Sequence, residues 1–398
     1  MGFSFFQGSS PPIAIDFGSA STKLMQAKLG ERPVLQAAAE LPMPDSVRGD
    51  HAREVEYLQE FLPSLLSRAK CKGRRVVISV PGSKTLVQHM NLPKLGDTDD
   101  ATLINTQLSM QFGCPPDAIV TRHVDVCDVH RGGATQREVL VFAIPHDTIM
   151  RYVTLLRKMK LEVVGVHTAP HALVHSFSHL NRQNSDRAVV NCYINVGWSN
   201  TLVAIAHGSN IVFARQIDVG GRHFDEQISQ ALRCDIAAAR SHRLTMGEMA
   251  ERVDAPAAAT AMMGVAAARA ANGGGEDHGD RSMATPASNA GVTDEHLRDL
   301  HLLELLDVLG DEISMSIRYH KGLFPDAAIE RLIFLGGESR QIWLCRHLTR
   351  QLGLPAQLGD PLSRFHPAVG LETPGLDLGE PQPGWAVACG LCQAPTDL

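Results

Sequence analysis

The sequence predicts an α/β protein that contains two related sheet domains. Apolar runs of strand length alternate with helical periodicity along most of the 398 residues. A pattern of β-hairpin, third strand and helix opens the chain and recurs weakly after residue 187, which indicates an internal duplication. A Gly-containing turn follows an apolar strand in three places, at 16–19, 195–201 and 336–339. Together these features favour duplicated sheets whose strands end in polar turns.

Length and charge narrow the class further. A chain of 398 residues is long enough for two or more domains. Its net charge of −6 argues against a broad nucleic-acid-binding surface. No apolar run is long enough to span a bilayer and residues 1–10 lack the pattern of a signal peptide, so we expect a cytoplasmic protein with reduced cysteines. Cys389 and Cys392 have no second CxxC pair to complete a zinc site, so we expect them in the core.

The first half opens with two strands joined by a Gly/Ser turn. The helix expected at 52–69 is amphipathic, because Val55, Leu58 and Leu62 share one face. Pro145 suits the first turn of a helix. The expected strands are 12–17, 21–28, 33–39, 74–80, 84–91, 118–127, 136–144 and 161–167, and the expected helices are 52–69, 98–112, 145–160 and 169–180.

The second half repeats the hairpin and third strand. Gly220 and Gly221 end that third strand, and a helix follows through Phe224 and Ile228. Large apolar residues are scarce in 245–292, so we expect a mobile insertion loop there. The expected strands are 187–195, 199–206, 209–217 and 331–335, and the later helices are expected at 293–322, from residue 341 and at 384–392.

The first turn carries the most informative chemistry. An apolar strand delivers the carboxylate of Asp16 to a turn of small residues, and Lys23 lies near the start of the next strand. Backbone N–H groups in such a turn can approach a phosphate closely, and Asp16 is placed to hold a hydrated Mg²⁺. An ordinary hairpin with a polar turn fits the same residues equally well, so the rest of the chain has to decide.

The three turns, in this order and strand context, resemble the layout of the actin-like ATPase superfamily. Within it the chain is similar to the type IV pilus assembly protein PilM family, which is related to the cell-division protein FtsA. The resemblance runs from about Pro12 to Leu391, with its main gap at 245–292. The segments that carry it are IAIDFGSASTKL, VISVPGSKTLVQHMNLPKL, DATLINTQLSMQFGCPPDAIV, INVGWSNTLVAI, QIDVGGRHFDEQISQAL, LLELLDVLGDEISMSIRYHKGLFP, LIFLGGESR and PGWAVACGL.

The resemblance implies an actin-like ATPase fold, with two duplicated sheet domains around a nucleotide cleft. It places the first domain at 1–38 and 145–180, an inserted FtsA/PilM-type subdomain at 39–144, and the second domain at 181–398. It implies ATP and Mg²⁺ as cofactors, with Asp16 holding the metal through water. Each implied glycine also fits a plain tight turn. The implied nucleotide-binding residues are Asp16, Gly18, Ser19, Ala20, Ser21, Lys23, Asn195, Gly197, Thr201, Gly220, Gly221, Gly336, Gly337 and Glu338.

Three residues depart from the family pattern. Asn195 stands where the second phosphate turn usually has an aspartate, so one negative charge and a general base are lost. Trp198 sits in the same turn, where small residues are usual, and Glu338 replaces a small residue in the adenosine turn. Because phosphoryl transfer depends on positioning and charge neutralisation, we expect binding without turnover, or at most a slow ATPase.

The resemblance therefore implies a nucleotide-binding scaffold of a type IV pilus-type assembly or secretion machine. It implies a cytoplasmic protein, peripheral to the inner membrane, that binds the N-terminal segment of a PilN-like membrane partner, and it leaves room for an oligomer. Two alternatives stay open. One is a sugar or small-molecule kinase of the same superfamily, for which no catalytic aspartate stands out. The other is an FtsA-like filament former, although the tail at 393–398 is too short and polar for a membrane-binding helix.

Overall fold

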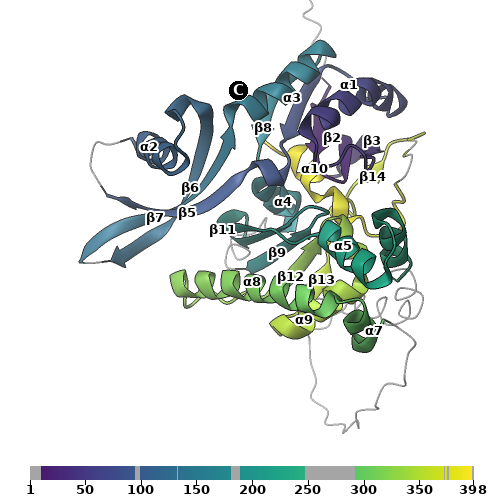
Figure 1. Cartoon of the computed structure of the whole chain (residues 1–398). Helices are drawn as coiled ribbons and strands as arrows, with labels where there is room; N and C mark the ends of the chain where they lie inside the picture. The colour runs from purple at the N-terminus through teal and green to yellow at the C-terminus, as the bar shows by residue number, and fades with distance from the viewer. Residues whose placement is uncertain are drawn as a thin grey trace, which may run out of the picture.

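The computed structural model describes residues 10–94, 99–131, 133–180, 189–246, 292–371, 373 and 376–396. The segment expected to be a mobile insertion loop, 245–292, lies almost entirely outside these residues. The described chain forms three sheets of six, five and three strands. Two of them stack one above the other in Figure 1, and the three-stranded sheet projects to one side.

The first sheet has the strand order β14-β3-β2-β1-β4-β8. Its first three strands form an antiparallel meander, and β4 and β8 run parallel to β1. Alternation along β1 turns Ile13 and Ile15 toward helices α1 and α3, whereas Ala14 faces α10 (Ala386–Leu391) and α4. The elements are β1 (Ile13–Phe17), β2 (Ser21–Lys28), β3 (Val34–Pro42), α1 (His51–Arg68), β4 (Arg75–Ser79), α3 (His146–Lys158), β8 (Glu162–His167) and α4 (Ala169–Ser176).

The second sheet repeats this plan in the order β11-β10-β9-β12-β13. Three antiparallel strands are again followed by two parallel ones, so the predicted internal duplication is confirmed. Helices α5, α8 and α9 cover one face, and α4 packs on the other. The elements are β9 (Val190–Val196), β10 (Thr201–His207), β11 (Asn210–Ile217), α5 (Gly221–Leu232), β12 (Arg331–Leu335), α9 (Ile342–Leu352) and β13 (Ala356–Leu358).

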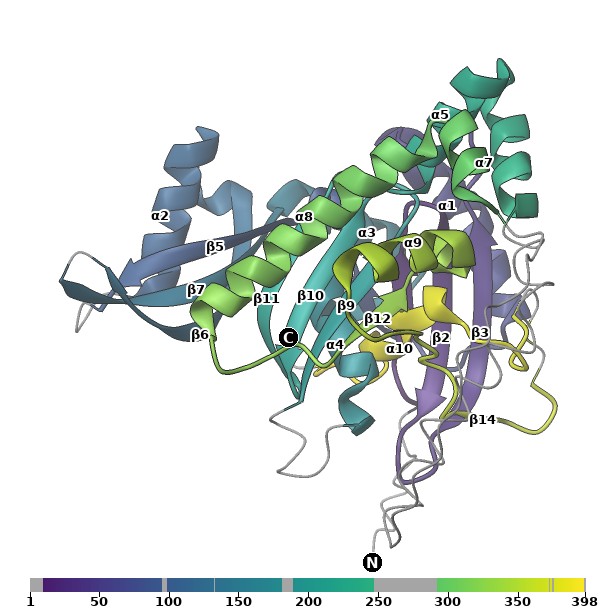
Figure 2. The same ribbon diagram turned by 90° about the horizontal axis from the view of Figure 1, so that it is seen from below.

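The helix predicted at 293–322 is divided in two. The structure shows α7 (Asp294–Asp299) and α8 (Leu302–Leu323), and His301 between them has a φ of 56°, in the left-handed region. The bend lets Leu297, Leu300 and Leu302 all enter the same core, which one straight helix cannot do. Beyond the bend α8 crosses the second sheet obliquely (Figure 2).

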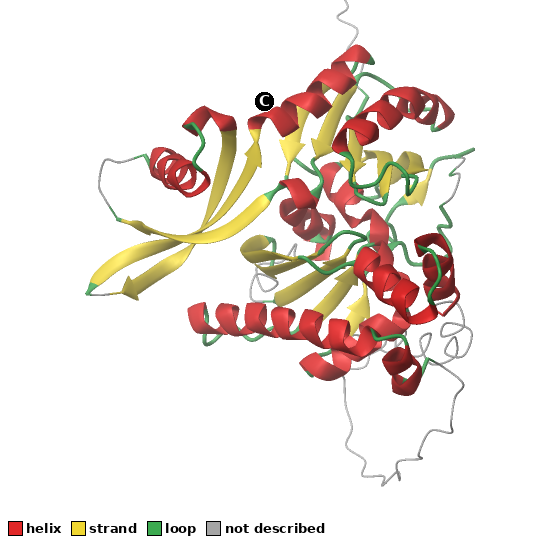
Figure 3. Cartoon of the chain, viewed as in Figure 1, coloured by secondary structure: helices red, strands yellow, loops and turns green. Residues whose placement is uncertain are grey.

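The three-stranded sheet is an insertion in the first domain. It has the order β5-β7-β6, and α2 covers one face through Ile104 and Leu108. Figure 3 shows its long strands extending away from the other two sheets. The elements are β5 (Leu86–Pro93), α2 (Asp100–Phe112), β6 (Ile119–Arg131) and β7 (Ala134–Pro145).

The boundary predicted for this insertion, 39–144, starts too early. The end of β3 pairs with β2, and β4 pairs with β1 and β8, so both belong to the first sheet. Helix α1 packs on that sheet as well. The insertion therefore begins between β4 and β5.

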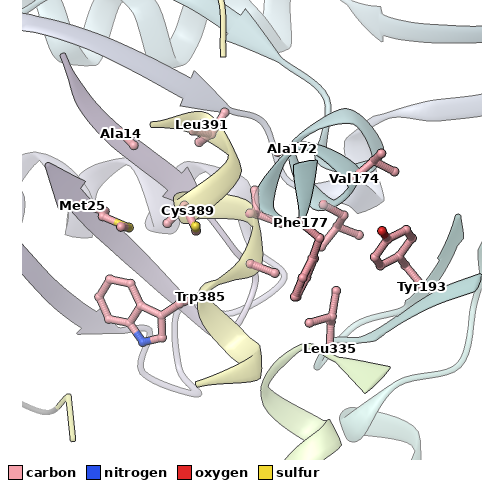
Figure 4. Packing of buried hydrophobic residues seen from close by; sticks show 14 of the residues in the cluster. Ala14, Met25, Ala172, Val174, Phe177, Tyr193, Leu335, Trp385, Cys389 and Leu391 are labelled. Atoms are coloured by element: carbon pink, nitrogen blue, oxygen red, sulfur yellow. The ribbon is translucent and has the colours of Figure 1, made fainter. Parts of the chain in front are cut away.

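The last part of the chain returns to the first domain, although the prediction assigned all of 181–398 to the second. The short strand β14 (His366–Pro367) pairs with β3, and α10 (Ala386–Leu391) packs against β1 and α4. Figure 4 shows Cys389 and Leu391 of α10 beside Ala14 of β1 and Ala172 of α4. This cluster joins the two sheets. Among the described residues, no helix combines the length and the apolar run needed to cross a membrane.

Candidate functional site

The first Gly/Ser turn closes the hairpin between β1 and β2. In the register of this hairpin Asp16 lies opposite Lys23 and Phe17 opposite Thr22, so residues 18–21 are left to turn the chain. A Cβ added to Gly18 would lie 2.8 Å from the carbonyl oxygen of Ser21, which is closer than real Cβ contacts allow. The tightness of the turn therefore selects glycine at this position.

The two charged residues nearest this turn are bonded within the first domain. Ser79 Oγ donates to Asp16 Oδ1 at 2.7 Å. Burial raises the pKa of Asp16, and Lys23 and the Ser79 hydroxyl partly oppose that rise. Lys23 Nζ donates to Ser21 Oγ at 2.8 Å and lies 3.3 Å from Glu40 Oε1. Asp16 and Lys23 therefore stabilise the turn through contacts within the first domain.

The second turn is held by backbone contacts with the start of α5. Gly221 N donates to Gly197 O at 3.0 Å, and Arg222 N donates to Trp198 O at 2.8 Å. A Cβ on Gly220 would lie 2.6 Å from Gly197 O and 2.7 Å from the nitrogen of Asn200. The first N–H groups of α5 therefore donate hydrogen bonds to the turn itself.

Thr201 shares this structural role. Its buried hydroxyl donates to Val219 O at 2.7 Å. Asn195, the position where the family pattern has an aspartate, lies near the end of β9, opposite Leu202 of β10 and Leu335 of β12.

The third turn follows β12. Gly336 has a φ of 89°, and a Cβ there would overlap the backbone of Val196 at the end of β9. Glu338 forms an ion pair with Arg243, and its carboxylate packs over Gly221, where a Cβ would overlap it. Gly337 has no atom within 4 Å of the position that a Cβ would take. In this structure Glu338 is a partner of Arg243, not an open carboxylate.

Arg243 also ties the third turn to α5. Its Nε donates to Asp225 Oδ1 at 2.7 Å, so two carboxylates hold one buried guanidinium. Although burial opposes the charge, Glu338 and Asp225 raise the pKa of Arg243 above its ordinary value. The turn at 336–339 and α5 are therefore held together by buried charge.

The first two turns face each other across a cavity of about 350 Å³. The hydroxyls of Ser19 and Ser199, one from each domain, are hydrogen-bonded at 2.8 Å. Gln216 Nε2 donates to Gly82 O at 2.6 Å and adds a second contact between the domains. The cavity lies where the resemblance places the nucleotide phosphates.

Only part of the predicted set lines this cavity. Gly18 and Ser19 do, and the second turn contributes Trp198 and Ser199. Among the described residues, the cavity lining omits Asp16, Ala20, Ser21, Lys23, Asn195, Gly197, Thr201, Gly220, Gly221, Gly336, Gly337 and Glu338. Most of these residues stabilise the turns without lining the cavity.

Three arginines that the sequence reading missed also line the cavity. Arg48 comes from the loop between β3 and α1, Arg222 from α5, and Arg240 from the helical residues 236–246. The guanidinium carbons of Arg48 and Arg240 lie 5.0 and 5.8 Å from the centre of the Trp198 ring. A search for basic residues near Trp198 in sequence would have found Arg222 but not the other two.

The residues around the cavity suit the phosphate end of a nucleotide better than a directly bound metal ion. Serine hydroxyls and guanidinium groups are donors for phosphate oxygens. The second turn offers no carboxylate at Asn195, and Asp16 already accepts from Ser79. In the described ranges, no group of three His, Cys, Asp or Glu side chains is arranged to hold a metal ion. A Mg²⁺ ion would therefore be held through water and phosphate oxygens.

Comparison with known proteins agrees with this geometry. A family model described as type IV pilus assembly protein PilM matches residues 14–256. Among solved structures, a PilM–PilN type IV pilus biogenesis complex is similar over 96% of this chain and 98% of that chain, with 18% identity and a TM-score of 0.70. This likeness shows the fold and confirms the predicted actin-like architecture.

Two more distant structures cover a similar share of the chain. MreB5 of Spiroplasma citri bound to ADP is 14% identical over 96% of this chain and 94% of that one, with a TM-score of 0.47. The ethanolamine utilization protein EutJ from Carboxydothermus hydrogenoformans is 11% identical over 96% and 88%, with a TM-score of 0.46. No curated protein matches the sequence.

Proposed function

The chain belongs to the type IV pilus assembly protein PilM family, and from this we infer that it is a nucleotide-binding scaffold of a type IV pilus-type assembly or secretion machine. In this role, closure of the cleft between the two domains changes the affinity for a membrane partner. The observation that carries this proposal is the contact between the two turns through Ser19 and Ser199. A phosphate group that accepted hydrogen bonds from both hydroxyls would contact both domains at once.

The ligand of the cleft is ATP, with Mg²⁺ held through water beside Asp16. Support comes from the cavity between the turns and from its hydroxyl and guanidinium lining. Turnover is slow or absent, because Asn195 supplies neither a second carboxylate nor a general base. Binding, not hydrolysis, then sets cleft closure.

The partner is an inner-membrane protein of the PilN kind, which contributes its cytoplasmic N-terminal segment. Support comes from the similarity in fold to the PilM of a PilM–PilN complex. The segment docks on the first domain beside the inserted sheet formed by β5, β6 and β7, and the protein is thereby held at the cytoplasmic face of the inner membrane. The inserted sheet touches the second domain through β11, so closure of the cleft can reach this surface.

A binding titration tests the proposal. A fluorescent peptide with the N-terminal cytoplasmic sequence of the neighbouring membrane protein is titrated with the full chain, with and without ATP and Mg²⁺. We expect saturable binding that ATP changes by about tenfold, since coupling between sites is typically 1–3 kcal/mol. We also expect ATP consumption well below about one per second.

The control peptide has the same composition in scrambled order and should not bind. Equal binding of the two peptides would refute the scaffold role. Binding of the native peptide that ATP leaves unchanged would refute the coupling between the cleft and the partner.

A further inference from the structure

Resting on the proposed nucleotide site, we propose that Arg48, Arg222 and Arg240, together with the indole of Trp198, form a phosphate-anion site that needs no divalent cation. Its ligand is a terminal phosphate group, either of a nucleotide or of a free inorganic phosphate compound. The site assigns a ligand to arginines that lie outside the three Gly turns.

Unmatched hydrogen-bond donors are the first argument. Arg48 Nε, Arg222 Nε, Arg240 Nη2 and Trp198 Nε1 are all buried atoms without a hydrogen-bond partner in the described part of the chain. All four side chains line the same cavity. Buried donors are nearly always paired, because an unpaired donor has lost its water without compensation. A cavity with four such donors is built for an acceptor-rich ligand.

The balance of charge is the second argument. Arg48 and Arg240 both approach Trp198, and the same carboxylate oxygen of Asp45 is ion-paired with both guanidinium groups, while Arg240 Nε also donates to Asp225 Oδ2 at 3.0 Å. Burial lowers the pKa of Arg48, and the nearby Arg240 lowers it further, although Asp45, Asp225 and Glu338 oppose this. Arg48 therefore shares its carboxylate partner with a second guanidinium group, and a further anion beside it would favour its charged form.

For Arg48 and Arg222, the acidic residues that line the cavity do not supply that anion. Asp218 lies 3.4 Å from Arg222 but is 88% exposed, and Glu226 is exposed as well. Glu54 Oε1 accepts a hydrogen bond from the Gly49 nitrogen at 3.0 Å. A carboxylate in water screens a neighbouring charge only weakly. Arg48 and Arg222 therefore keep a net preference for a phosphate oxygen, and Arg240, already paired with Asp225, adds its unpaired Nη2 donor.

The origin of the arginines gives the site its role. Arg48 belongs to the first domain, and Arg222 and Arg240 belong to the second, so one anion would bridge both. Guanidinium groups bind phosphate through paired N–H donors and neutralise its charge. The arginines thus do by themselves what a metal ion and a pair of carboxylates would otherwise do. This explains why the second turn can lack a carboxylate at Asn195.

Calorimetric titration of the full chain tests the site. ATP, ADP, adenosine and pyrophosphate are each titrated, once with Mg²⁺ and once with excess EDTA. We expect ATP to bind in EDTA with an affinity within about threefold of that in Mg²⁺, and adenosine to bind far more weakly. Pyrophosphate binding would identify a free phosphate compound as a sufficient ligand, whereas binding of ATP alone would assign the site to the nucleotide.

Variants locate the binding. Arg222→Gln removes a half-exposed guanidinium, and Arg48→Lys keeps the charge but removes the Nε donor. Each should weaken ATP binding in EDTA about tenfold or more, as expected for a lost charged hydrogen bond. Arg53→Gln is the matched control, because Arg53 lies on the nearby helix α1, is 66% exposed and is not among the cavity lining. Thermal unfolding of each variant verifies that it is folded.

Three results would overturn the inference. ATP binding that disappears in EDTA would show that the phosphates need a metal ion. Full affinity in both arginine variants would place the phosphates elsewhere and leave the nucleotide-binding scaffold standing. Absence of ATP and pyrophosphate binding in any buffer would remove the anion site together with the nucleotide part of the proposed function, while peptide binding would still be measured separately.

Discussion

The first and second hairpins of this protein share a backbone topology, but their turns are held by different chemistry. The first turn is supported by side chains, since Asp16 is bonded to Ser79 and Lys23 to Ser21 and Glu40. The second is supported by main chain, since the first N–H groups of α5 bond its carbonyls. Duplication therefore preserved the geometry of the cleft and not its donors and acceptors.

The two halves also differ in the charged side chains that they place beside the cavity. Without a carboxylate at Asn195, the second domain places arginines and the indole of Trp198 beside the cavity. The first domain contributes Arg48 to the same cluster. The two halves thus keep the same strand plan while different side chains from each line the cavity between them.

The largest expected effect comes from the backbone contact that supports the second hairpin. Gly336→Ala places a Cβ into the backbone of Val196 and forces a left-handed conformation on alanine. We expect a loss of about 3 kcal/mol in the free energy of unfolding, measured by urea denaturation. Gly18→Ala should cost less, because its Cβ would crowd only the Ser21 carbonyl group.

Gly337→Ala is the control for this comparison. Its Cβ would meet nothing within 4 Å, so stability should change by less than about 0.5 kcal/mol. Equal losses in Gly336→Ala and Gly337→Ala would contradict the claim that the second turn depends on close backbone packing.

Stability measured at several pH values tests whether buried histidines outside the turns contribute equally in different parts of the fold. Burial lowers the pKa of His171, in α4 between the two sheets, and of His320, in α8 on the outer face of the second, to about 4. The unfolded chain takes up these protons first as the pH falls below about 6.5, so stability is fully present above that pH and is lost toward pH 4. We expect a loss of up to about 1.4 kcal/mol per pH unit for each histidine.

Urea denaturation of the wild type, His171→Gln and His320→Gln at pH 7, 6 and 5 measures these contributions. Each variant should flatten the pH profile by a similar amount, because the two histidines have similarly lowered pKa values. A profile that neither substitution changes would mean that other groups control acid sensitivity.

The smallest expected effect comes from removing the asymmetry of the turns. Asn195→Asp returns a carboxylate to the end of β9, where it can hold water on Mg²⁺ or accept a proton. We expect ATP hydrolysis in Mg²⁺ to rise by about tenfold or more over a slow wild type, measured as phosphate release. Asn210→Asp, at an exposed position on β11, should leave the rate unchanged. Equal rates in both variants would show that the missing carboxylate does not limit turnover.

Much of the fold could be predicted because local patterns of apolar residues and glycines determine it. The two hairpins follow from apolar strands flanking Gly turns, and they occur within a few residues of the predicted positions. Strands β13 and β14 have three and two residues, too few to produce a periodic pattern. The bend at His301 depends on burying leucines on both sides of it, which periodicity within one helix does not reveal.

The site was predicted less completely for the same physical reason. The turns could be found because glycine is needed where backbone atoms approach closely, as at Gly18 and Gly336. The partners of the Trp198 ring could not, because Arg48 and Arg240 reach it from segments far apart in the sequence. The pairing of Glu338 with Arg243 is another tertiary contact that no local pattern encodes.

The closing helix α10 has a consequence for how the chain is made. It packs against β1 and α4, and Gly390 is the residue that allows it to approach Ala172 so closely. The first sheet is therefore covered by residues that are synthesised only after the whole second sheet. During synthesis that apolar face waits without its cover, which favours late, long-range folding and a need for protection by chaperones.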